Sequence, residues 1–190
     1  MKLMGEEALV QHCKRGENAA RRELYDTYAG QMLAICYRYA GGMDVSRDLL
    51  HDGFLKVFSS ISSFQYRGAG SLRAWMSRIF VNTALEYLKR KEMMREVVPL
   101  DQIAELEDVE EEELSGIPTP VLMQFVRELP VGYRTVFNLY TFEEMSHKEI
   151  AALLHINERS SSSQLARAKA LLVRKVNEYI RRQSEYGRKG

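Results

Sequence analysis

The sequence is poor in proline and cysteine and contains no long apolar run, and each shortage excludes a class of protein. Four prolines and 12 glycines among 190 residues favour helices over an architecture of strands and turns. Cys13 and Cys36 form neither a disulfide framework nor a paired metal motif, so both are expected to be buried. The chain lacks a run of about 18 apolar residues, and its N-terminus lacks the apolar block of a signal peptide. These absences predict a cytoplasmic, all-α protein without membrane insertion.

The motifs of common enzyme classes are also missing. The sequence has no H-x-x-x-H pair, no G-x-S-x-G elbow and no phosphate-binding glycine loop, and its four histidines are scattered. We therefore predict that the protein is not an enzyme and that it has neither a metal site nor a cofactor.

One internal stretch of the chain contains no basic residue. Residues 97–120 hold eight acidic residues and no basic residue, although the whole chain has a net charge of only +1. Residues 1–96 carry 15 basic and 11 acidic residues, and residues 121–190 carry 12 basic and seven acidic residues. Two basic blocks around an acidic strap favour a polyanionic partner such as nucleic acid. The alternative is that the basic helices are merely solvated.

The acidic stretch also divides the chain. Its prolines and glycine, with little apolar periodicity, are typical of a linker. We predict two small helical domains, residues 1–96 and 119–190, joined by an acidic linker over residues 97–118.

The first domain shows helical periodicity in three segments. Apolar residues recur every three or four positions over residues 24–39, 49–61 and 72–87. Glycines 41 and 42 end the first of these helices, and the loop FQYRGAG precedes the third, which starts at Ser71. The third helix is apolar on two sides, so it is predicted to be central and packed from two directions.

The second domain has the pattern of a helix-turn-helix. Ser146 and Glu149 form a capping box that opens a short helix, and a turn with the apolar residue Ile156 leads to the last helix. That helix opens with four serines, of which Ser160, or Asn157 before it, would cap and Ser161 would pack. Ser162, Ser163 and several basic residues would point outward, as in a recognition helix whose hydroxyls and charges meet DNA. An ordinary capped surface helix is the alternative.

Two stretches together resemble one family. DLLHDGFLKVFSSISSFQYRGAGSLRAWMSRIFVNTALEYLKRK resembles the second conserved region of bacterial RNA polymerase sigma factors of the extracytoplasmic-function type, in the sigma-70 family. LPVGYRTVFNLYTFEEMSHKEIAALLHINERSSSSQLARAKALL resembles their fourth region. The resemblance covers roughly residues 20–96 and 120–180, in the family's order and spacing.

The resemblance implies a function and partners. Such a factor binds core RNA polymerase, through a coiled coil of the largest subunit, and directs it to promoter DNA. The first domain would read and help melt the minus-ten element, and the second would read the minus-thirty-five element. The linker would run through the polymerase, and an anti-sigma factor is an expected further partner.

The resemblance also assigns residues to these roles. The core-polymerase-binding residues would be Asp48, Asp52, Phe54, Leu55 and Lys56. The minus-ten residues would be Phe64, Gln65, Tyr66, Arg67, Arg73, Arg78, Asn82, Lys89 and Arg90. The minus-thirty-five residues would be Lys148, Arg159, Ser162, Ser163, Ala166, Arg167 and Lys169. The residues themselves leave alternatives open: Phe54 as core, Phe64 as a loop anchor, Asn82 as a satisfied core amide.

Two positions depart from the pattern. Many family members have glycine where His155 stands, so His155 is expected in a turn conformation that costs more than glycine would. Many have a basic residue where Ser162 stands, which removes a phosphate or guanine contact, so promoter sequence does not carry over.

Two other functions compete with this interpretation. A helix-turn-helix regulator that acts without polymerase would explain the second domain but not the first. The other is a helical adaptor that binds only proteins, and tight, salt-sensitive DNA association by the polymerase complex would argue against it.

Overall fold

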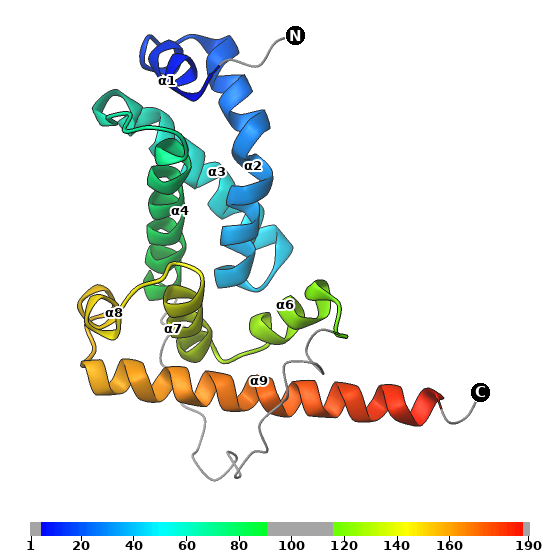
Figure 1. Cartoon of the computed structure of the whole chain (residues 1–190). Coiled ribbons are helices and arrows are strands. Elements are labelled where there is room, and N and C mark those ends of the chain that lie inside the picture. Colours follow the sequence, from blue (N-terminus) through cyan, green and yellow to red (C-terminus); the bar gives the residue numbers. More distant parts are fainter. Residues whose placement is uncertain (1–4, 91–115, 188–190) are drawn as a thin grey trace. The chain divides into compact units, whose positions relative to one another are not determined.

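The computed structural model describes residues 5–90 and 116–187, with side chains described through residue 183. The chain divides into two compact units, residues 1–91 and 92–190, and every regular element in the described residues is a helix (Figure 1). The predicted all-α fold is confirmed. Most of the acidic linker, residues 97–115, lies outside the described residues. No helix within the described part of the chain is both long enough and apolar enough to cross a membrane.

The first unit is a bundle around one central helix. Its elements are α1 (Glu6–Lys14), α2 (Asn18–Ala40), α3 (Met43–Ser60), the 3-10 turn η1 (Ile61–Ser63) and α4 (Ser71–Arg90). Helix α4 packs against both α2 and α3, which confirms the prediction of a helix covered from two sides (Figure 1). Met76 and Phe80 are fully buried, and Val81 and Leu85 are buried as well.

A single glycine allows α3 to approach α4 closely. Gly53 is buried in the middle of α3, and a β-carbon built there would overlap the Phe80 ring of α4. The Phe80 ring also packs edge-on against Phe54, with 5.3 Å between the centroids. The absence of a side chain at position 53 therefore sets how α3 lies on α4.

We expect Gly53→Ala to destabilise the protein by about 1–3 kcal/mol, because the added methyl group displaces a packed aromatic ring. Gly30→Ala is the matched control: Gly30 is exposed in the interior of α2, with open space around its β-carbon position. It should stabilise by up to about 1 kcal/mol through helix propensity. Chemical denaturation measures both, and equal effects of the two substitutions would refute the close approach.

The second unit is arranged along one long helix. Its elements are α6 (Thr119–Arg127), α7 (Val131–Thr141), α8 (His147–Leu154) and α9 (Glu158–Gly187). Helices α6, α7 and α8 all pack against α9, whose 30 residues extend about 45 Å at 1.5 Å per residue (Figure 1). Leu129, Tyr133 and Ala168 form a buried cluster between α7 and α9.

The turn between α8 and α9 follows the predicted helix-turn-helix chemistry. The Ser146 hydroxyl accepts from the Glu149 N–H, and the Glu149 carboxylate accepts from the Ser146 N–H at 2.8 Å. His155 ends α8 in the left-handed conformation, with φ 57° and ψ 42°. Asn157 is the cap of α9, because its Oδ1 accepts from the Ser160 N–H at 2.7 Å. The capping box and the turn conformation of His155 are both confirmed.

We expect His155→Gly to stabilise the second unit by about 0.5–1 kcal/mol. A left-handed conformation costs a residue with a β-carbon about 1–2 kcal/mol, and part of the relief is offset by glycine's larger unfolded-state entropy. His155→Ala keeps the β-carbon and so should bring no gain. Thermal unfolding compares the two, and an equal gain from alanine would contradict the role of the backbone.

Candidate functional site

One face of α3 carries two carboxylates and an exposed leucine. Asp48, Asp52 and Leu55 lie within about 60° of one another at 100° per residue, and all three are exposed. Leu55 is 56% exposed, more than any other large apolar residue in the described residues. This face combines negative charge with an exposed apolar side chain, which suits a basic, partly apolar protein surface.

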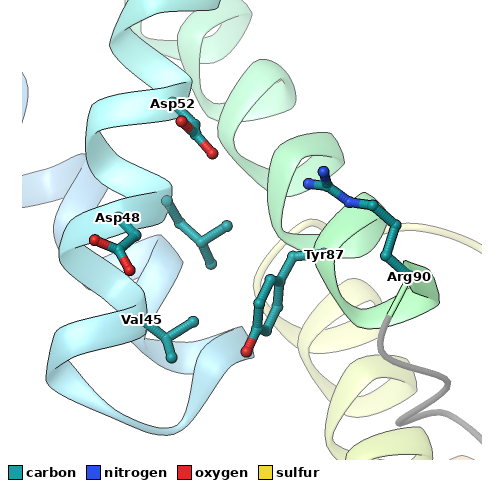
Figure 2. A pocket seen from close by; sticks show the side chains of 6 residues that line it. Val45, Asp48, Asp52, Tyr87 and Arg90 are labelled. Carbon is teal, nitrogen blue, oxygen red and sulfur yellow. The ribbon is translucent and has the colours of Figure 1, made fainter.

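A cleft separates this part of α3 from α4. The cleft has a volume of about 590 Å³. It is lined by Val45, Asp48, Leu49 and Asp52 of α3 and by Tyr87 and Arg90 of α4. Figure 2 shows the Asp52 carboxylate and the Arg90 guanidinium pointing toward each other from opposite walls. Arg90 therefore lines this cleft together with Asp52.

Two other predicted members of this set are engaged inside the unit. Phe54 is only 3% exposed, and its ring packs against Tyr25, Phe58 and Phe80. It is a core residue, about 200° around α3 from Asp52, which is the alternative that the sequence left open. Lys56 donates to Glu86 of α4 at 2.7 Å, so it joins α3 to α4 at the surface.

The loop between η1 and α4 presents some of its residues and buries one. Gln65 and Arg67 are exposed and Tyr66 is half-buried. Phe64 is 6% exposed and packs on the Trp75 ring, with 4.8 Å between centroids. Phe64 is therefore an anchor of the loop, which is the alternative that the sequence left open.

Hydrogen bonds close this loop onto the start of α4. The Arg67 N–H donates to the Ser71 hydroxyl at 3.1 Å, and the Ser71 N–H donates to the Gly68 carbonyl at 3.1 Å. Gly68 and Gly70 have φ of 110° and 83°, which residues with a β-carbon rarely adopt. The exposed loop residues are thus carried on a defined turn.

A residue that sequence reasoning missed joins this loop. The Glu6 carboxylate of α1 accepts from the N–H groups of Gly70 and Leu72, each at 2.8 Å. No local pattern could reveal a partner more than 60 positions away. The only hint in the sequence is that the glycine before Ser71 offers no capping side chain.

The polar residues of α4 fall on different sides of the helix. Arg78, Asn82 and Lys89 lie within about 40° of one another and are exposed, whereas Arg73 lies about 140° from Arg78 on the other side. Asn82 is therefore a surface amide and not a satisfied core amide. Arg73 instead lies near Tyr28, where it offsets part of the rise that burial causes in the tyrosine's pKa.

The start of α9 divides its serines as predicted. Ser161 is fully buried, and its hydroxyl lies 3.0 Å from Nδ1 of His147 in α8. Ser162 and Ser163 are exposed, and the Ser163 hydroxyl donates to the Ser160 carbonyl at 3.1 Å. The packing serine therefore joins the two helices of the motif, and Ser162 and Ser163 face outward.

The remaining predicted residues of this unit are exposed, with a single exception. Lys148, Arg159, Ala166 and Lys169 are exposed. Arg167 is half-buried and donates to the Tyr133 hydroxyl of α7 at 3.3 Å, so its guanidinium is partly held by the core of the unit. The small side chain of Ala166 would let the helix backbone come close to another surface.

Comparison with known proteins gives two family matches on this chain. The families described as Sigma-70 region 2 and Sigma-70, region 4 match residues 24–93 and 121–172. The ECF RNA polymerase sigma-E factor of Haemophilus influenzae is 25% identical over 182 residues, covering 90% of this chain and 95% of that protein. The ECF RNA polymerase sigma-E factor of Escherichia coli K12 is 26% identical over 188 residues, covering 93% and 97%. A solved structure of CnrH in complex with the cytosolic domain of CnrY has a TM-score of 0.48 and 22% identity, covering 91% and 97%.

Proposed function

Because the chain belongs to the sigma-70 family of RNA polymerase sigma factors, in its extracytoplasmic-function branch, we propose that it binds core polymerase and selects promoters with both of its units. One observation carries the proposal: both family regions occur in order on one chain, and each lies almost entirely within its own compact helical unit. A helix-turn-helix regulator that acts without polymerase does not need the first of these regions.

The core-binding surface in this proposal is the exposed face of α3. Leu55 lies one turn beyond Asp52 and two turns beyond Asp48, so an apolar contact lies beside two negative charges. A coiled coil of the largest polymerase subunit would meet this face with apolar and basic side chains. Phe54 supports the surface from below through its packing in the core.

The minus-ten surface joins the loop before α4 to one side of that helix. Gln65, Tyr66 and Arg67 would meet bases unstacked from the melted strand, since aromatic rings stack on bases and arginine binds phosphate. Along α4, Arg78, Asn82 and Lys89 would follow the DNA backbone as one stripe. Arg73 and Arg90 would act at the two ends of the helix.

The minus-thirty-five surface is the exposed side of the first turns of α9. Ser162, Ser163 and Ala166 would enter the major groove, where short side chains allow close approach to base edges. Arg159, Lys169 and Lys148 would bind phosphates around the groove. Arg167 would reach the DNA from its position beside Tyr133.

The acidic linker and an anti-sigma factor complete the proposed function. We propose functional domains over residues 1–96 and 119–190, with residues 97–118 as a negatively charged connection that runs through polymerase channels built for nucleic acid. An anti-sigma factor would hold the protein inactive until a signal arrives.

Transcription in vitro with the organism's own core enzyme tests the proposed function directly. The purified chain should confer start-site selection on genomic DNA fragments, and the mapped start sites should share two upstream elements. A core enzyme that initiates no better with the chain than without it would refute the proposal. DNA binding by the free chain, with the polymerase unaffected, would instead support the regulator.

A further inference from the structure

The start of α4 lacks a cap of its own. Gly70 stands before the first helical residue and offers no side chain that could accept from the free N–H groups of the first turn. Ser71 already lies inside the helix, and its hydroxyl accepts from the Arg67 N–H of the loop. The helix that carries the proposed minus-ten residues therefore depends on a cap from elsewhere.

Helix α1 supplies that cap. The Glu6 carboxylate accepts from Gly70 with Oε2 and from Leu72 with Oε1, both at 2.8 Å. One N–H belongs to the loop and the other to the helix, so a single side chain fixes the junction between them. Its negative charge also lies at the positive end of the α4 dipole.

Helix α1 also packs against the chain at the other end of the loop. Leu9, Val10 and Cys13 of α1 are buried, and α1 packs against α2 and against η1, the turn that directly precedes Phe64. The loop from Phe64 to Gly70 is thus bounded by α1 on both sides. Exposure of Gln65 and Arg67 on that loop depends on a helix outside it.

Glu6 also shares an electrostatic neighbour, Tyr28, with two of the proposed minus-ten residues. Burial raises the pKa of Tyr28, the Glu6 carboxylate raises it further, and Tyr66 adds to the rise while Arg73 opposes it. Two of these neighbours, Tyr66 and Arg73, stand among the proposed minus-ten residues. Glu6 and these two residues therefore all act on Tyr28.

We infer that Glu6 is a positioning residue for promoter melting, which holds the loop from Phe64 to Gly70 in the shape that receives an unstacked base. The inference rests on the proposed function and extends it to a residue that does not itself touch DNA. It makes α1 part of the minus-ten apparatus, although α1 precedes the matched family region, which begins at residue 24.

The test uses the full chain bound to its core polymerase. The probe is a single-stranded oligonucleotide of the minus-ten element from a start site mapped with the wild-type chain, with 2-aminopurine at each position in turn. Glu6→Ala should weaken oligonucleotide binding roughly fivefold, the loss expected from removing a helix cap, and should reduce the fluorescence change of the flipped base. Glu6→Gln keeps one acceptor oxygen and should fall between alanine and wild type. Glu7→Ala, an exposed acidic neighbour on the same helix, should match wild type.

Two further measurements separate positioning from general stability. Affinity for core polymerase should be the same for all four proteins, and amide hydrogen exchange in the free chain should rise several-fold at Gly70 and Leu72 only in the Glu6 variants. Equal oligonucleotide binding by Glu6→Ala and Glu7→Ala would overturn the inference, as would a parallel loss of core affinity. If the wild-type complex does not bind the oligonucleotide, the proposed function is refuted. Faster amide exchange in Glu6→Ala would still support the role of Glu6 in fixing the loop.

Discussion

Reversing one charge on α3, by Asp52→Lys, is expected to weaken binding to core polymerase by roughly 30-fold or more. Opposed charges at a protein interface that are turned into like charges cost several kcal/mol, and each 1.4 kcal/mol is a factor of ten. Asp52 lies at the centre of the proposed surface, one turn from Asp48 and beside Leu55. Its carboxylate is exposed, so the folded unit loses little when the charge is reversed. A binding titration with labelled core enzyme measures the change.

The control for this prediction is Glu7→Lys, which reverses an exposed carboxylate on α1 of the same unit. It alters net charge by the same amount and should leave core affinity within about twofold. Thermal unfolding should show that both variants remain folded. If Asp52→Lys binds core enzyme as tightly as Glu7→Lys does, the α3 face is not the core-binding surface.

Much of the fold follows from periodicity and caps in the sequence. The glycines after Ala40 end α2 with Gly41 in the left-handed conformation, and the S-x-x-E pattern at Ser146 opens α8. These features depend on residues within a few positions of one another, so a local pattern contains all the information. The position of Gly53 against Phe80 is different, because it needs the register between two helices. Only the packed structure provides that register.

In the candidate site, the exposure of a side chain could be predicted where the residue lies on a helix with a clear apolar face. Phe54 shares the apolar stripe of α3 with Leu50 and Val57, so periodicity alone already placed it opposite Asp52. Its assignment to the core-binding set came from the family resemblance and ignored that phase. Phe64 had no phase to follow because it lies in a loop, and its burial depends on the Trp75 ring.

Long-range polar contacts were beyond the sequence. Glu6 and Gly70 are far apart in the chain, and the pair Lys56–Glu86 also joins separate helices. Surface carboxylates have many partners that would be chemically acceptable, so composition selects none of them. A missing local cap, as at Gly70, is the kind of gap that shows where such a partner is needed.

The largest effect expected in the second unit comes from Ala166→Glu. Ala166 is exposed on α9, one turn beyond Ser162, where the proposed recognition helix approaches DNA most closely. A glutamate there would bring a longer side chain and a negative charge against the phosphates and acceptor-rich base edges of the groove. We expect transcription from promoters with the upstream element to fall at least tenfold, since a lost major-groove contact costs about 1–3 kcal/mol before repulsion is added.

The folding of the helix should not account for that loss, because glutamate is a good helix former at an exposed position. Gln183→Glu adds the same charge to the exposed C-terminal part of α9, about 25 Å along the helix, and should leave transcription unchanged. Core affinity should be equal for both variants, since the first unit is untouched. A promoter in which the upstream element is scrambled provides the decisive comparison. On that promoter, transcription with the wild type should fall to the level seen with Ala166→Glu. If Ala166→Glu still transcribes at least tenfold less than wild type there, Ala166 lies outside the DNA interface.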